Sequence, residues 1–283
     1  MIINVLDKGY VKLINHMGDD MSPVLDARVS TGTDSDPERD DALREFLLEH
    51  RHTSPFESMI MQVELKIPIC ILRQLERHRT VDNCDGIVIE SLDENFRKWF
   101  SPNEQSGRYT AFKEEFYIPD IILGPDKVNK QGSSKELDEE LQNSYKNTLL
   151  NKNIEEYEEY NQYIQKGVSK ETARFLLSQN VYTIRRFTAS FHNWKDLLEK
   201  RKTRNAQREA RKYAEAIYTI MRSLWPKSCA LLEEHSFGGV HLCKTEVEWI
   251  KDLLSREGSK EFISRLGSYS ERRWAKFFAK LTI

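Results

Sequence analysis

The chain has 283 residues, of which 39% are hydrophobic and 31% are charged, and its formal net charge is −2. This length can bury a substantial core as one large domain or two small ones. The balanced charge gives no global reason to expect a nucleic acid partner, and no apolar run reaches the length of a membrane span. The N-terminus also lacks the basic and apolar regions of a signal peptide. We therefore predict a cytoplasmic protein without a membrane or nucleic acid partner.

The four cysteines (Cys70, Cys84, Cys229 and Cys243) are scattered along the chain and form no Cys-x-x-Cys motif. No histidine spacing accompanies them that would indicate a zinc site, and none has the electropositive surroundings that activate a thiolate. We predict reduced thiols and no metal site. The chain also lacks a Gly-x-Gly-x-x-Gly motif and a P-loop, so a bound cofactor would not lie in a dinucleotide-binding fold.

Hydrophobic periodicity predicts strands and helices in the N-terminal third. Residues 1–15 alternate between apolar and polar around Asp7-Lys8-Gly9, which predicts two strands joined by a turn. Residues 34–50 predict a helix, because Pro37 and acidic residues favour a first helical turn. Residues 59–67 alternate again and predict a strand.

An arginine-rich segment, Arg73-Gln74-Leu75-Glu76-Arg77-His78-Arg79, follows that strand. Pro68 can begin a helix, in which Ile69, Leu72 and Leu75 form a buried stripe. Gln74, Arg77 and His78 then share another face, because residues three and four apart are neighbours on a helix. Taken alone, such a helix end is more often a solvated surface or a structural salt bridge than a binding site.

A second polar segment, Asn103-Glu104-Gln105-Ser106-Gly107-Arg108-Tyr109, lies further along the chain. Its asparagine and glycine indicate a turn, and the aromatic residues that follow predict a strand over residues 109–117. A tight turn at Ser106-Gly107 lets backbone N–H groups approach a phosphate. With the arginines of residues 73–79, this segment suits a phosphorylated, planar ligand such as a nucleotide, although an ordinary turn is the alternative.

The C-terminal half reads as mostly helical. Residues 126–166 are polar with apolar residues at helical intervals, which predicts a solvated helix. Another helix begins after Ser169 as N-cap, and residues 181–184 predict a strand. The basic segment 195–212 could be a nucleic-acid-binding helix. We favour a packed helix with a mixed surface, because an apolar stripe runs through it, formed by Ala206, Ala210, Tyr213, Ala214, Ile217 and Met221.

Three separated blocks resemble the family of flavin-dependent thymidylate synthases. The first block pairs Arg77-His78-Arg79 with residues 101–109, which match Arg-His-Arg followed by Asn-Glu-x-Ser-x-Arg-Tyr. Residues 50–57 are similar to the family's His-x-x-Pro-Phe-Glu element, and residues 201–211 to its Arg-(x)4-Ala-Gln-x-Glu-x-Arg block. The spacer of the first block is longer than the family's, which predicts an insertion at about 82–100. We expect residues 1–250 to form the family domain and residues 251–283 a C-terminal helical extension.

The resemblance implies an α+β fold with an antiparallel sheet flanked by helices, assembled as a homotetramer. It implies reductive methylation of deoxyuridylate (dUMP) to thymidylate (dTMP), with methylenetetrahydrofolate as carbon donor, FAD reduced by NADPH, and no enzyme cysteine nucleophile. In the family FAD lies between subunits, so an isolated monomer would lack a complete site.

The resemblance also implies the roles of particular residues. Arg201 is the expected catalytic group, because a fixed guanidinium beside the uracil ring stabilises developing negative charge. Arg174 is expected to reach the nucleotide phosphate from a neighbouring subunit. The deoxyuridylate site is expected to comprise Gln74, Arg77, Glu104, Gln105, Ser106, Gly107, Arg108, Arg174 and Arg201. The FAD site is expected to comprise Ser54, Arg77, His78, Arg79, Glu104, Ser190, His192 and Asp196.

The chain departs from the family pattern at two places near the expected FAD diphosphate. The chain has Ser190-Phe191-His192 where the family usually has Asn-x-Arg, and histidine does not replace a bidentate arginine conservatively. Asp196 adds a carboxylate there. Two alternatives to thymidylate synthesis stay open. One is C5-alkylation of uridylate (UMP) or another pyrimidine nucleotide, and the other is a catalytically silent nucleotide- or RNA-binding protein.

Overall fold

The computed structural model describes residues 1–34, 36–76, 101–127, 132–237 and 243–257. The chain packs as two units, Met1–Phe237 and Gly238–Ile283. The second contains the helix α9 (Lys244–Glu257), so the predicted extension from residue 251 begins inside a helix. Arg77, His78, Arg79 and the predicted insertion lie outside the described residues. None of the helices in the described ranges is long and apolar enough to cross a bilayer.

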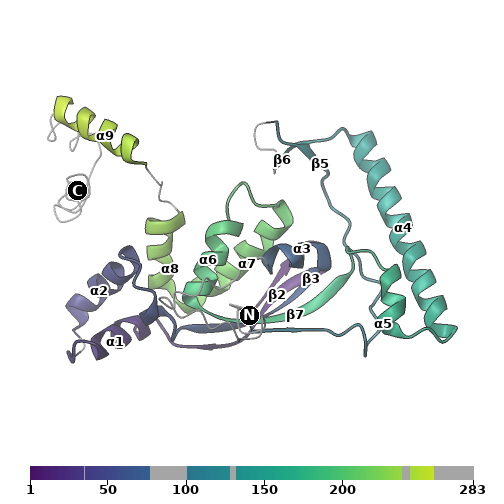
Figure 1. The fold of residues 1–283 in the computed structure, drawn as a ribbon, viewed down its shortest axis with the longest axis horizontal. Helices are drawn as coiled ribbons and strands as arrows, with labels where there is room; N and C mark the ends of the chain where they lie inside the picture. Colours follow the sequence, from purple (N-terminus) through teal and green to yellow (C-terminus); the bar gives the residue numbers. More distant parts are fainter. Residues whose placement is uncertain (35, 77–100, 128–131, 238–242, 258–283) are drawn as a thin grey trace, which may run out of the picture. The chain divides into compact units, whose positions relative to one another are not determined.

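A five-stranded antiparallel sheet organises the first unit, in the order β1-β2-β3-β7-β4 (Figure 1). Its strands are β1 (Ile2–Val5), β2 (Gly9–Met17), β3 (Ile60–Pro68), β7 (Tyr182–Ser190) and β4 (Ser101–Glu104). The strand pair in residues 1–15 and the strand over 59–67 are confirmed. The strand predicted over 181–184 is confirmed but continues to Ser190, so it pairs along the whole of β3.

The two faces of β3 differ because successive side chains of a strand point to opposite sides. Met61, Val63, Leu65 and Ile67 are fully buried on one face. On the other face Glu64 accepts hydrogen bonds from Tyr10 Oη at 3.0 Å and from Arg186 Nε at 2.9 Å. The core therefore lies on one side of the sheet, and charged side chains line the other.

Three helices cover the apolar face: α3 (Ile69–Leu75), α6 (Phe191–Arg201) and α7 (Arg208–Leu224). In α7 the residues Tyr213, Ala214, Ile217 and Met221 are fully buried, which confirms the packed apolar stripe. The single helix predicted for the basic segment 195–212 is wrong, because α6 ends at Arg201 and α7 begins at Arg208. Ala206, placed on the same stripe by its spacing, is only half-buried and precedes α7, in the connection from α6. Side chains also fasten these helices to β3, because Trp194 Nε1 donates to the carbonyl of Met61 at 3.3 Å.

A second group of helices and helical turns packs together beside the sheet. These are α1 (Ser22–Val29), α2 (Pro37–Glu49), the 3-10 turn η1 (Ser54–Phe56), α8 (Pro226–Leu232) and the π-helical turn η4 (Glu233–Phe237). The helix predicted over residues 34–50 is confirmed as α2. Asp20 joins this group, because its carboxylate accepts hydrogen bonds from the backbone N–H groups of Lys227 and Ser228 at 2.9 and 2.8 Å.

The solvated helix predicted over residues 126–166 is confirmed only for α4 (Glu139–Gln165), which begins where the Asp138 side chain accepts the N–H of Leu141 at 2.9 Å. Within the predicted range, residues 133–136 form a strand instead. A hairpin that the sequence does not predict precedes α4, formed by β5 (Leu123–Pro125) and β6 (Ser133–Glu136). Ser169 is the N-cap of α5 (Lys170–Ala173), as predicted, but that helix is short and continues as the 3-10 turn η3 (Arg174–Leu176).

The strand predicted over residues 109–117 is wrong. The strand of this region, β4, ends at Glu104 before the turn, and after it only Phe116 makes an isolated bridge, with Val181. Phe112, Phe116 and Tyr117 are nevertheless buried. Side chains of α4 hold this segment, since Tyr157 Oη donates to the carbonyl of Phe112 at 3.0 Å. The aromatic residues of this segment thus indicate burial of their side chains, and not pairing in a strand.

Candidate functional site

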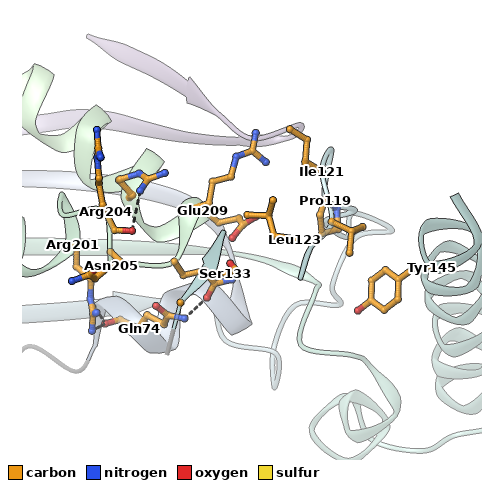
Figure 2. A pocket seen from close by; sticks show the side chains of 16 residues that line it. Gln74, Pro119, Ile121, Leu123, Ser133, Tyr145, Arg201, Arg204, Asn205 and Glu209 are labelled. Atoms are coloured by element: carbon orange, nitrogen blue, oxygen red, sulfur yellow. Dashed lines mark hydrogen bonds between the residues drawn. The ribbon is translucent and has the colours of Figure 1, made fainter. Parts of the chain in front are cut away.

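A cavity of about 550 Å³ opens beside the C-terminal end of α6 and the start of α7 (Figure 2). This volume lies in the range of small-molecule sites. Its floor and walls come from α3, from the connection between α6 and α7, and from residues 119–123 and 132–133. It is lined by Gln74, Pro119, Ile121, Ile122, Leu123, Gly132, Ser133, Tyr145, Arg201, Arg204, Asn205, Ala206, Gln207, Arg208, Glu209 and Arg211.

Arg201 enters this cavity from the last residue of α6. Its Nε and Nη2 donate to the backbone carbonyl of Gln74 at 3.2 and 2.9 Å, which sets the plane of the guanidinium. The Gln74 side chain in turn donates from Nε2 to Oε1 of Gln207. The structure thus brings together the predicted residues Arg201 and Gln74, and adds Gln207. A guanidinium held in one orientation in a half-buried site can stabilise negative charge without reorganising.

The apolar wall of the cavity is held by Asp120, which the sequence analysis did not identify. Arg208 donates two hydrogen bonds to the Asp120 carboxylate, at 2.5 and 2.8 Å, and Lys212 lies 3.8 Å from it. The Arg208 hydrogen bonds lower the pKa of Asp120 to about 2. Since Pro119 and Ile121 flank this residue and line the cavity, the ion pair fixes the wall against α7. No motif marks Asp120 in the sequence.

The predicted turn lies directly after β4. Ser106 organises it, because its carbonyl accepts the N–H of Tyr109 at 3.2 Å and its Oγ accepts the N–H of Arg108 at 3.3 Å. Gly107 is buried, and a Cβ there would lie 2.6 Å from the ring of Phe112 and 3.2 Å from Cδ of Arg174. Only glycine permits this approach. The turn and Arg174 therefore meet within one chain.

The two arginines at this turn are exposed. Arg108 Nε donates to Oε2 of Glu171 at 2.6 Å, with the two side chains 61% and 48% exposed. Arg174 Nε donates to the backbone carbonyl of Glu171 at 3.2 Å. Within the described part of the chain, the cavity lining includes neither Arg174 nor residues 104–108. The residues predicted for deoxyuridylate thus occupy two places on one chain, the cavity and the turn.

Glu104 lies where β4 enters the turn and is held by β7. Its Oε1 accepts a hydrogen bond from Thr183 Oγ1 at 3.1 Å, and its Oε2 pairs with Nη1 of Arg185. The other nitrogen, Nη2, lies 2.6 Å from Oε1 of Glu76. Arg185 was missed in the sequence, although a signal exists. It pairs with the fully buried Leu65, so an arginine stands on the apolar face of the sheet.

Three of the residues predicted for FAD lie around the N-terminus of α6. Ser190 is its N-cap, and His192 follows in the first turn. Ser54 begins η1, whose Phe56 stacks on Phe191 with ring centroids 5.5 Å apart. The structure therefore brings Ser54, Ser190 and His192 to one region. Glu104 is held instead by Arg185 and Thr183.

The charges around His192 explain how it differs from the arginine usual in the family. Burial lowers the pKa of His192, and the nearby charge of Asp196 only partly opposes this. The Nε2 atom lies 3.9 Å from Oδ2 of Asp196, and Oδ1 of Asp196 lies 3.6 Å from Nζ of Lys195. His192 is therefore a neutral hydrogen-bonding group at pH 7, and Asp196 has a cationic neighbour.

Comparison with known proteins places the chain in a family. The family model for thymidylate synthase complementing protein matches residues 12–227. A flavin-dependent thymidylate synthase of Thermus thermophilus is 39% identical over 270 residues, covering 94% of this chain and 91% of the relative. That of Kosmotoga olearia is 39% identical over 248 residues, covering 87% and 99%.

A solved structure shares the fold. The UMP/dUMP methylase PolB from Streptomyces cacaoi, bound with 5-Br dUMP, superposes with a TM-score of 0.69 at 23% identity, over 83% of this chain and 98% of that one. The two sequence relatives and the family model cover most of the chain at high similarity. The chain belongs to the family of flavin-dependent thymidylate synthases.

Proposed function

We propose that this protein methylates deoxyuridylate reductively to thymidylate, with methylenetetrahydrofolate as carbon donor and NADPH reducing FAD. The observation that carries the proposal is the guanidinium of Arg201, fixed on the Gln74 carbonyl inside the cavity. Methyl transfer to C5 of uracil needs a ring that can take on negative charge. A preorganised guanidinium beside the ring imide stabilises that charge more in the transition state than in the ground state.

The phosphate of the nucleotide is assigned to the turn. Arg108 and Arg174 present two guanidinium groups, which suit an anion with several oxygens, and the side chain of Arg174 lies against Gly107 of the turn. The cavity and the turn occupy different places on one chain. This separation supports a homotetramer in which the cavity of one subunit meets the turn of another, so that each site draws on two chains.

The region around α6 fits the diphosphate of FAD in part. The N-terminus of α6 carries the positive end of the helix dipole, which favours an anion, and Ser54 and Ser190 add hydroxyl groups. A neutral His192 supplies a hydrogen bond but no charge, so we expect weaker FAD binding than an arginine would give. Arg77, His78 and Arg79 remain part of this proposed site. When bound, the flavin supplies the reducing electrons.

The cysteines support chemistry without a thiolate nucleophile. Burial raises the pKa of Cys70 and raises that of Cys229 to about 12, so both are neutral thiols at pH 7. Cys243 is exposed in the second unit, and Cys84 lies outside the described residues.

Product analysis tests the proposal. The protein is incubated without oxygen with FAD, NADPH, methylenetetrahydrofolate and equal amounts of deoxyuridylate and uridylate, and the nucleotides are weighed by mass spectrometry. We expect thymidylate as the only methylated product, and none when methylenetetrahydrofolate is left out. Methylated uridylate would instead indicate the substrate variant. No product from a folded oligomer would indicate a silent nucleotide- or RNA-binding protein, which steeply salt-dependent RNA binding would support.

A further inference from the structure

Arg185 lies between two carboxylates from different elements. Its Nη2 is 2.6 Å from Oε1 of Glu76, directly after α3, and its Nη1 pairs with Oε2 of Glu104, the last residue of β4. The Arg185 side chain is 13% exposed, against 20% for Glu76 and 32% for Glu104. This pairing is therefore largely shielded from solvent and from screening by salt.

The neighbours of this cluster are the two parts of the proposed nucleotide site. Glu76 is two residues beyond Gln74, whose carbonyl orients Arg201. Glu104 directly precedes the turn that approaches Arg174 at Gly107. Arg185 itself contacts neither the cavity lining nor the turn arginines among the interactions of the described residues. It acts on both parts only through the carboxylates that it holds.

The chemistry of arginine suits this role. The N–H groups of a guanidinium lie in one rigid plane and point outward along its edges, so it can hold two carboxylates at a set separation. A lysine ammonium is a point charge and does not fix such a geometry. Thr183 Oγ1 supports the arrangement by donating to Oε1 of Glu104 at 3.1 Å. One oxygen of Glu104 is thus set by Thr183 and the other by Arg185, which leaves the carboxylate one orientation.

We infer that Arg185 is a positioning residue that holds the end of α3 and the end of β4 at a fixed separation, and so aligns the two parts that this chain contributes to pyrimidine nucleotide sites, one at Gln74 and one at Glu104. The inference rests on the proposed function for the identity of the ligand. It assigns Arg185 no contact with that ligand.

The test compares Arg185→Lys with Arg186→Lys in the full-length protein. Arg186 is the next residue of β7, on the opposite face of the sheet, where it pairs with Glu64 and is 51% exposed. Both variants keep the charge and remove a guanidinium. For each, calorimetry measures the dissociation constant for deoxyuridylate, and thermal unfolding measures stability. We expect the affinity of Arg185→Lys for deoxyuridylate to be about tenfold weaker, because a lysine ammonium cannot hold two carboxylates in the geometry that a guanidinium sets. The affinity of Arg186→Lys should be unchanged.

A second variant separates positioning from general stability. Glu76→Gln leaves the pairing of Arg185 with Glu104 in place and releases only α3, so we expect a smaller loss of affinity. In the double variant Glu76→Gln with Arg185→Lys, the two losses should be less than additive, because both break one connection. If Arg185→Lys fails to fold, the test uses Glu76→Gln instead, and its affinity for deoxyuridylate is compared with that of Arg186→Lys.

The outcomes separate this inference from the proposed function. Unchanged affinity in Arg185→Lys or in Glu76→Gln, or fully additive losses, would overturn the inference even if thymidylate is formed. A lowered unfolding temperature with unchanged affinity would show that Arg185 is only structural. If the parent protein binds deoxyuridylate but forms no product, the proposed function fails, while the positioning role is still decided by the binding series.

Discussion

The cavity and the turn both present an arginine, but the two arginines differ in exposure and in the group that holds them. In the cavity, Arg201 is partly buried and its guanidinium is fixed by a backbone carbonyl that cannot move independently of α3. At the turn, Arg108 is 61% exposed and its partner is the flexible side chain of Glu171. Exposed pairs of this kind contribute little because water and salt screen them. This difference fits the proposed roles, in which the cavity acts on a bound ring and the turn captures a phosphate.

The largest expected effect comes from removing the fixed guanidinium. Arg201→Ala should lower kcat by about 100-fold to 1,000-fold, the usual cost of losing one preorganised charge-stabilising group. Steady-state kinetics with deoxyuridylate measures this. Arg39→Ala, which removes an 83% exposed arginine of α2, is the matched control and should be neutral. Turnover near normal in Arg201→Ala would rule out its assigned role.

The turn should respond differently to the same substitution. Arg174→Ala should weaken deoxyuridylate binding by about tenfold or more with little change in kcat, because its contact to the phosphate is the same in the ground state and the transition state. Calorimetry gives the affinity, and Lys166→Ala removes an exposed cation at the end of α4 as the control. Equal affinity in Arg174→Ala and the parent would remove Arg174 from the site.

A smaller effect of opposite sign tests whether Glu171 competes with the phosphate for Arg108. Glu171→Gln removes the negative charge 2.6 Å from Arg108 Nε, so the guanidinium no longer has to leave an ion pair to bind phosphate. We expect deoxyuridylate to bind about two- to threefold more tightly at low salt, and the gain to shrink as salt rises. Weaker binding would mean that Glu171 orients Arg108 rather than competes for it.

The smallest effect concerns the wall of the cavity. The pKa of Asp120 is lowered to about 2, so the ionised carboxylate stabilises the folded state above pH 3.8, its ordinary pKa, and this contribution is lost as the pH falls towards 2. Since the side chain is 57% exposed, solvent screening limits the contribution to about 0.5 kcal/mol. Urea unfolding at pH 7 should show Asp120→Asn slightly less stable than the parent. The difference should vanish near pH 2, and a difference that persists there would have another cause.

The elements with strong local periodicity were predictable, and those defined by distant partners were not. β3 and α2 were predicted within a few residues, because alternation and first-turn residues are local signals. The aromatic run at 109–117 was misread as a strand because strand propensity reports burial on a packed surface. Here the partners are distant in sequence, since Phe112 is held by α4 and Tyr117 donates to Glu209 of α7.

The sequence alone determined the family and predicted several chemical groups of the proposed site. The blocks at 50–57, 101–109 and 201–211 indicated the family, and Arg201 and Gly107 were named from them. Arg174 was named from the family's counterpart of the helix that follows Ser169. Only the tertiary structure decided how these groups are held. Arg185 meets Glu104 across 81 residues of sequence, and Arg208 meets Asp120 across 88. The physical reason is that a charge pair depends on where two elements pack, and a single residue at each end leaves no period or spacing for the sequence to show.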